Sequence, residues 1–311
     1  MTDIVIVGGG PAGATAAIYA ARAGRSVKIY EKENIGGQIV SSPMVDNYPG
    51  LPHLNGAAWA EKLEGQLQEL SVEIIYDEVT GIDIDGDPQD PKAFFVKSGS
   101  GREKCAAVIL ATGVKHRSLG LAGEEAFEGC GISYCAVCDG AFYKDLPVAV
   151  VGGGDSALQE ALYLASVCSE VHLIHRRERF RGEKRLAQRV INNPKIKIHY
   201  NKTADHLLED KGQLTGICLK DVNTGELTEL SLSGIFPAVG LIPQSDAFQG
   251  LIDMDDAGYY FVGEDALTNV PGILAAGDAR IKMVRQLTTA VGDGAAAAVA
   301  ACGHLDSRQT M

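Results

Sequence analysis

Ile4-Val-Ile-Val-Gly8-Gly-Gly10-Pro-Ala-Gly13 and Val148-Ala-Val-Val-Gly152-Gly-Gly154-Asp-Ser-Ala157 share one pattern, and they decide the fold. Each apolar run predicts a β-strand ending in a glycine turn, followed by a helix and a second strand, at residues 26–30 and 170–174. This is the order of a dinucleotide-binding βαβ unit. One glycine-rich turn could arise from packing alone, but two in this context argue against that. The sequence predicts an α/β protein with two Rossmann-like, three-layer ββα domains.

The glycines of each turn have separate physical tasks. The first permits the tight turn, and the second lets the backbone approach a pyrophosphate with no Cβ in the way. The third position, which can also be alanine, lets the helix pack closely on the strand, with its positive N-terminus toward the phosphates. In order, these positions are Gly8, Gly10 and Gly13 in the first unit and Gly152, Gly154 and Ala157 in the second.

The residues after the second strands differ and predict different cofactors. Glu31 lies 23 positions after Gly8, where an acid accepts hydrogen bonds from free ribose hydroxyls, as in FAD or NAD. The same offset in the second unit reaches His175-Arg-Arg177, with Arg181 one helical turn further. Arginines there neutralise the 2′-phosphate of NADP. A solvated basic face is the alternative, but the acidic chain and the offset favour phosphate.

The domain boundaries follow from the repeat. Strand-forming stretches at 93–96 and 106–110 follow the first unit, and others at 214–219 and 227–240 follow the second. Gly272 to Asp278 then read as a return to the first domain. We expect residues 1–115 and 245–311 to form one discontinuous domain, into which a second domain, residues 116–244, is inserted.

A pair of cysteines precedes the second fingerprint. Cys135 and Cys138 are three residues apart, which puts both sulfurs on one face if a helix starts there, and a helix N-terminus favours the reactive thiolate. The alternative is half of a zinc site, but structural zinc needs about four ligands, and no second Cys-x-x-Cys or close His pair exists. The spacing therefore favours a redox pair, and no metal is expected.

Composition excludes some classes of partner. The net charge of −12 argues against wrapping nucleic acid or docking on an anionic membrane. A strand-like run starting at Asp3 leaves no room for a signal peptide, and the small-residue run 294–302 is too short to span a bilayer. Seven scattered cysteines indicate mostly free thiols in a reducing compartment. We expect a cytoplasmic protein.

Taken together, the motifs resemble those of the low-molecular-weight thioredoxin reductases over essentially the whole chain. The matching marks are Gly8-Gly-Gly-Pro-Ala-Gly13, Gly36-Gly-Gln38, Asp46-Asn-Tyr-Pro-Gly50, Ala111-Thr-Gly113, Cys135-Ala-Val-Cys-Asp139, Gly152-Gly-Gly-Asp-Ser-Ala157, His175-Arg-Arg177 with Arg181, Gly277-Asp278 and Arg285-Gln286. Departures occur at Val137, Gly182 and Leu241, where close members often carry other residues.

The resemblance implies an activity and a set of roles. NADPH would reduce FAD, FAD would reduce the Cys135–Cys138 disulfide, and this pair would reduce oxidised thioredoxin, with rotation of the inserted domain between the half-reactions. Cys138 would be the thiol nearest the flavin, Cys135 would attack the partner disulfide, and Asp139 would be the general acid, although it could otherwise be a helix N-cap or a solvated acid. A homodimer is also implied.

The expected cofactor sites are specific. The FAD set is Gly8, Gly10, Pro11, Ala12, Gly13, Glu31, Gly37, Gln38, Asn47, Thr112, Gly113, Gly277, Asp278, Arg285 and Gln286. The NADPH set is Gly152, Gly154, Asp155, Ser156, Ala157, His175, Arg176, Arg177 and Arg181.

Two other functions remain open at this point. One is a related flavoprotein that reduces or oxidises another protein or small-molecule disulfide. Peroxide-linked relatives carry an extra N-terminal domain, which we do not expect here. The other is a nucleotide sensor that uses the cysteines for zinc.

Overall fold

The computed structural model describes residues 1–42, 45, 47–51 and 54–309 as two compact units. The discontinuous unit consists of Met1–Val40, Tyr48–Lys115 and Ile242–Met311, and the inserted unit of Ser41–Asn47 and His116–Leu241. The chain thus returns to the discontinuous unit at Ile242, three residues before the expected position, and segment 41–47 groups with the inserted unit.

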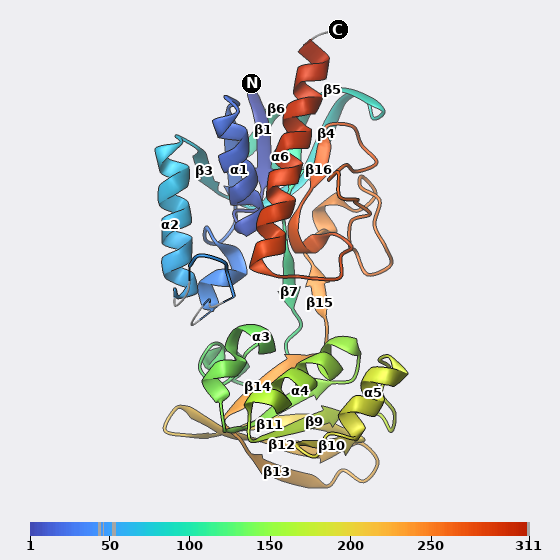
Figure 1. Ribbon diagram of the computed structural model, residues 1–311. Helices are drawn as coiled ribbons and strands as arrows, with labels where there is room; N and C mark the ends of the chain where they lie inside the picture. Colours follow the sequence, from blue (N-terminus) through green and yellow to red (C-terminus); the bar gives the residue numbers. More distant parts are fainter. Residues whose placement is uncertain (43–44, 46, 52–53, 310–311) are drawn as a thin grey trace. The chain divides into compact units, whose positions relative to one another are not determined.

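The sheet of the discontinuous unit has a parallel part and an antiparallel arm (Figure 1). The strand order is β3-β2-β1-β6-β5-β4, and β16 also pairs with β6. The strands β1, β2, β3, β6 and β16 run parallel, whereas β4, β5 and β6 are antiparallel. Their bounds are β1 Thr2–Val7, β2 Val27–Glu31, β3 Glu73–Tyr76, β4 Val79–Asp87, β5 Asp90–Ser98, β6 Gly101–Leu110 and β16 Ile273–Ala275.

Helices α1 (Pro11–Arg22), α2 (Gly56–Glu69) and α6 (Leu287–Gln309) cover this sheet, with α1 and α6 side by side (Figure 1). Small residues make this close packing possible, because a Cβ at Gly294 of α6 would collide with the Ala12 backbone of α1. Asn55 caps α2 by accepting a hydrogen bond from the Ala58 amide at 2.7 Å. Packing of α6 on α1 holds the C-terminal helix against the first βαβ unit.

The inserted unit has three layers. A parallel sheet, in the order β10-β9-β8-β14, has α4 and α5 packed on one face and an antiparallel sheet, β11-β12-β13, on the other. The bounds are β8 Pro147–Gly152, β9 Glu170–His175, β10 Ile196–Tyr200, β11 Lys202–Asp210, β12 Gln213–Asp221, β13 Leu227–Ser231, β14 Gly234–Ala238, α3 Ala136–Asp139, α4 Asp155–Val167 and α5 Lys184–Ile191. The predicted stretch 227–240 is therefore two strands, because the chain leaves one sheet for the other at Leu232–Ser233.

Two short strands form the connections between the units. β7 (Val114–His116) and β15 (Leu241–Pro243) pair with each other. Short 3-10 turns complete the regular structure, at Gly37–Ser41, Glu124–Phe127, Gly140–Tyr143, Asp246–Phe248 and Gly277–Ala279. Within the described part of the chain, no helix is both long and apolar enough to cross a bilayer.

Candidate active site

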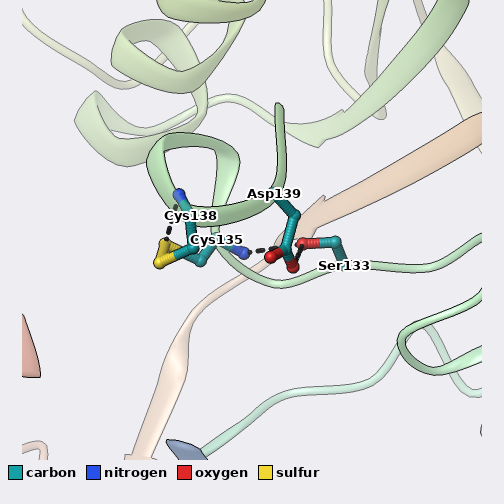
Figure 2. Close-up of a disulfide and its surroundings, with 4 residues drawn as sticks. All are labelled: Ser133, Cys135, Cys138 and Asp139. Carbon is teal, nitrogen blue, oxygen red and sulfur yellow. Dashed lines mark hydrogen bonds between the residues drawn. A yellow bond between two sulfur atoms is a disulfide. The ribbon is translucent and has the colours of Figure 1, made fainter. Parts of the chain in front are cut away.

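A disulfide joins Cys135 and Cys138 across the single turn of α3 (Figure 2). Their Cα atoms are 5.3 Å apart. Cys135 is the N-cap residue, and its Sγ accepts a hydrogen bond from the Cys138 amide at 3.2 Å. Both residues are half-buried. The three-residue spacing thus brings the sulfurs together through one helical turn.

A buried carboxyl group follows the disulfide. Ser133 Oγ donates to Asp139 Oδ2 at 2.6 Å, and the same Oγ accepts from the Cys135 amide at 3.2 Å (Figure 2). Burial raises the pKa of Asp139, while the Ser133 hydrogen bond acts in the opposite direction. Oδ1 is buried and has no hydrogen-bond partner among the described residues. Asp139 occupies the N-cap position of the 3-10 turn Gly140–Tyr143, but its side chain makes no capping hydrogen bond, and the residue is buried, not solvated.

Ser133 was not predicted from the sequence. It lies in the loop before α3 and is 4% exposed, held by its amide donating to the carbonyl of Ile235 in β14. A serine two residues before a cysteine is not a distinctive motif. Its role becomes visible only in the structure, where its hydroxyl connects the Cys135 amide to the Asp139 carboxyl group.

The first glycine turn leaves an open space at the N-terminus of α1, beside Gly10, which we call a cradle. A Cβ at Gly10 would have no atom within 4 Å, whereas a Cβ at Gly8 would collide with Ala111 and one at Gly13 with Gly8. Gly8 also has φ +105, in the left-handed region. Glu31, 8% exposed, accepts from the Gly9 amide at 2.6 Å with Oε2 and from the Glu33 amide at 2.8 Å with Oε1. The open space and the oriented acid fit a pyrophosphate and its ribose.

Other predicted FAD residues converge on this turn. A Cβ at Gly37 would lie 3.3 Å from Gly10 Cα, and one at Gly277 would lie 2.9 Å from Ala12 Cβ, so both segments approach the start of α1, where Pro11 is the first residue. Four other predicted FAD residues have the following positions. Gln38 Nε2 donates a hydrogen bond to Val114 O, and Thr112 Oγ1 is 3.3 Å from Tyr260 OH. Gly113 has φ +67, and Gln286 immediately precedes α6.

Asp278 is the polar group best suited to an added ligand. It lies in the turn Gly277–Ala279, and burial raises its pKa. Its Oδ1 is buried without a hydrogen-bond partner among the described residues, although Lys282 Nζ is 3.8 Å away. Arg285 Nε donates to its carbonyl at 3.2 Å. A hydroxyl-bearing cofactor would satisfy the unpartnered oxygen.

Two predicted marks lie in segment 41–47, which groups with the inserted unit. Asn47 is exposed. Asp46 lies outside the described residues.

The second glycine turn repeats the cradle in front of α4. A Cβ at Gly154 would meet nothing within 4 Å, whereas one at Gly152 would lie 2.7 Å from Ala157 Cβ. Asp155 and Ser156 begin α4, and Asp155 Oδ1 accepts from the Glu183 amide at 2.6 Å. This bond holds the following loop against the turn.

The predicted phosphate-binding arginines follow the end of β9. Arg176, Arg177 and Arg181 are exposed, and the Arg181 amide donates to Gly153 O at 2.8 Å. His175 is buried, with a ring nitrogen 2.9 Å from Arg179 O. Burial lowers the pKa of His175, and the neighbouring arginines lower it further. The His175 ring is therefore neutral and lies near the positive charges of Arg176, Arg177 and Arg181, which suit a phosphate group.

Known proteins share this architecture. The family model "Pyridine nucleotide-disulphide oxidoreductase" matches residues 2–294. The thioredoxin reductase of Peptoclostridium acidaminophilum is 40% identical over 98% of this chain and 97% of its own length. That of Escherichia coli O157:H7 is 40% identical over 98% and 96%. The crystal structure of thioredoxin reductase from Streptococcus pyogenes has a TM-score of 0.91 and 39% identity, covering 99% of both chains.

The chain belongs to the thioredoxin reductase family of the pyridine nucleotide-disulphide oxidoreductases. Membership confirms the predicted α/β dinucleotide-binding fold, the flavoprotein oxidoreductase class, and FAD and NADPH as cofactors. The two glycine cradles and the unpartnered Asp278 Oδ1 fit these cofactors.

Proposed function

We propose that this chain is an NADPH-dependent reductase of oxidised thioredoxin. The observation that carries the proposal is the disulfide Cys135–Cys138, formed beside the buried Asp139 in the unit that also carries the NADP-type arginines. FAD, when bound, supplies a two-electron acceptor for hydride from NADPH and the donor that reduces the disulfide.

Cys135 and Cys138 carry the exchange chemistry. In the dithiol state, the Cys135 thiolate attacks the thioredoxin disulfide and forms a mixed disulfide, releasing one thioredoxin thiolate. Cys138 then attacks Cys135 Sγ, closes the internal disulfide and releases the second thiolate. Two protons from the enzyme dithiol end on thioredoxin, so atoms and electrons balance. Val137 and Phe142, 49% and 44% exposed near the pair in sequence, offer apolar surface to a protein substrate.

Asp139 delivers and accepts the proton in this exchange. Ser133 occupies Oδ2, which leaves Oδ1 as the oxygen that carries the proton. Because burial raises the pKa of Asp139, the group is better suited to act as an acid near neutral pH than a solvated aspartate. Ser133 positions Asp139 and also fixes the Cys135 backbone.

The proposal assigns each unit a cofactor. The discontinuous unit, with Glu31, Gly10 and Asp278, holds FAD, and the inserted unit, with Gly154 and Arg176, holds NADPH. The cysteine pair and the nicotinamide site would then serve one flavin in turn by rotation about the paired strands β7 and β15. A cross-link between the units should stop turnover while one half-reaction survives; full steady-state activity of the cross-linked enzyme would refute the rotation.

The proposal also covers assembly and location. On the discontinuous unit, a shallow hollow is lined by Leu267, Ala295, Ala296, Val299, Ala300 and Asp265. Val299 and Leu267 are 64% and 50% exposed, which suits a contact with a second copy of the chain in a homodimer. We place the enzyme in the cytoplasm, because its scattered cysteines suit a reducing compartment.

An anaerobic titration tests the function. NADPH should bleach the flavin absorbance of the purified holoenzyme, and oxidised thioredoxin should restore it. Cys135→Ser and Cys138→Ser should each abolish thioredoxin reduction with FAD retained, whereas Cys130→Ser, at an exposed free thiol, should not. A colourless protein, or full reductase activity in either redox variant, would contradict the proposal. A panel of other disulfides would identify a different substrate.

A further inference from the structure

The outer face of the antiparallel sheet in the inserted unit carries a second group of reactive side chains. Asp205 and His206 lie on β11, and Cys218 lies on β12. One ligand atom of each, namely a carboxylate oxygen, a ring nitrogen and Sγ, lies within 4.8 Å of the other two. None of these residues belongs to the redox pair or to the predicted cofactor sets.

Strand register explains how the three side chains meet. His206 pairs with Cys218, and a bulge between Ala204 and His206 makes Asp205 an extra residue, so that two residues of β11 oppose one of β12. Ile217 and Leu219, on either side of Cys218, pack in the core between the two sheets. Side chains alternate along a strand, so the Cys218 side chain lies on the opposite, outer face.

The thiol is covered by polar groups. Cys218 is 1% exposed, whereas the side chains of His206 and Asp205 are 51% and 33% exposed. Glu229 of β13 is the register partner of Cys218 on the other side, and is exposed. Burial raises the pKa of Cys218, and the charges of Asp205 and Glu229 raise it further, while a backbone hydrogen bond from Thr228 lowers it.

The geometry points to a binding site for a thiolate-seeking divalent cation, such as Zn²⁺ or Cd²⁺, formed by Asp205, His206 and Cys218. Sulfur and imidazole ligands select such ions over Mg²⁺ or Ca²⁺. Bonds of about 2.0–2.3 Å in a tetrahedron place ligand atoms roughly 3.3–3.8 Å apart. The three ligand atoms, all within 4.8 Å of one another, would therefore need only a small inward shift to bind one ion. Asp205 Oδ2 and His206 Nδ1 are already 2.9 Å apart, close to the separation of two ligands of one ion. Glu229 or water would complete the coordination.

Binding exchanges a proton for the metal. The Cys218 S–H bond breaks, a sulfur–metal bond forms, and the proton passes to the buffer. No electrons are transferred. Affinity should therefore increase with pH.

Calorimetric titration of the oxidised holoenzyme with Zn²⁺ tests the site, because the closed Cys135–Cys138 disulfide removes those two sulfurs as competing ligands. We expect one equivalent bound with proton release, and affinity at least ~10-fold lower in Cys218→Ser and in His206→Asn. Cys130→Ser, which removes an exposed thiol outside the site, should bind as the unaltered enzyme does.

His206 is exposed, so its replacement keeps the test valid if Cys218→Ser does not fold. Absence of saturable binding would overturn the proposal. So would unchanged affinity in His206→Asn, or an equal loss in Cys130→Ser.

Discussion

Replacing Ser133 by alanine removes the hydroxyl that donates to Asp139 Oδ2 at 2.6 Å and leaves the carboxyl group buried. A hydrogen bond to a buried charged group contributes about 1.5–3 kcal/mol, and this one favours the carboxylate over the acid. Without it the pKa of Asp139 rises. One unit of pKa corresponds to about 1.36 kcal/mol. In the pH–rate profile of the thioredoxin-reducing step, the basic limb, where the rate falls as Asp139 loses its proton, should therefore move upward by about one to two pH units.

The assay is single-turnover oxidation of prereduced enzyme by thioredoxin across pH, followed by flavin absorbance. Asp139→Asn, which has no acid to lose, should slow this step about 100-fold or more and abolish the limb. Ser245→Ala is the matched control, because Ser245 is also a buried serine whose hydroxyl donates a hydrogen bond, to Gly258 O at 2.7 Å, and it belongs to the discontinuous unit. Reduction of the flavin by NADPH should be unaffected in all three variants. A slower step with an unmoved limb in Ser133→Ala would refute the positioning role.

Three further predictions follow from other parts of the inserted unit. Arg176→Ala should lower the preference for NADPH over NADH, measured as the ratio of kcat/KM values, about 10- to 150-fold, because a charge-assisted hydrogen bond contributes about 1.5–3 kcal/mol. Arg189→Ala, at an exposed residue of α5, is the control. An unchanged ratio in Arg176→Ala would reject the phosphate assignment. Gly154→Ala adds a Cβ that would meet no protein atom within 4 Å, so the unfolding midpoint and the flavin content should not change, while the KM for NADPH should rise about 10-fold or more. A normal KM would contradict the pyrophosphate site. His172 Nδ1 and His199 Nε2 are 2.9 Å apart, and burial lowers the pKa of His172 and lowers that of His199 to about 4. The unfolded chain therefore binds more protons than the folded one, and the free energy of unfolding should fall as the pH drops from 7 toward 4. His199→Gln should weaken this pH dependence, and urea midpoints that do not change over this range would disprove it.

Local sequence was sufficient for the elements whose signals lie within a short window. Both βαβ units and parts of the strands β5 and β6 could be predicted because glycine turns and apolar runs are local features. The strand β4 was not predicted, although its alternation of acidic and apolar residues, Thr80-Gly-Ile-Asp-Ile-Asp85, is typical of a half-buried strand. The inserted unit was expected to end at residue 244, whereas the chain returns to the discontinuous unit at Ile242, inside β15, which pairs with β7.

From the sequence alone, the family, the fold and a redox role for the cysteine pair could be predicted, because each of the motifs that indicate them is a short, local pattern. The three-dimensional structure was needed to show that Ser133 holds Asp139, that Asp278 Oδ1 is buried without a hydrogen bond from the described residues, and that Asp205, His206 and Cys218 meet on one sheet face. Hydrogen-bond partners, burial and cross-strand register arise from folding of distant segments against one another, and no local pattern encodes them.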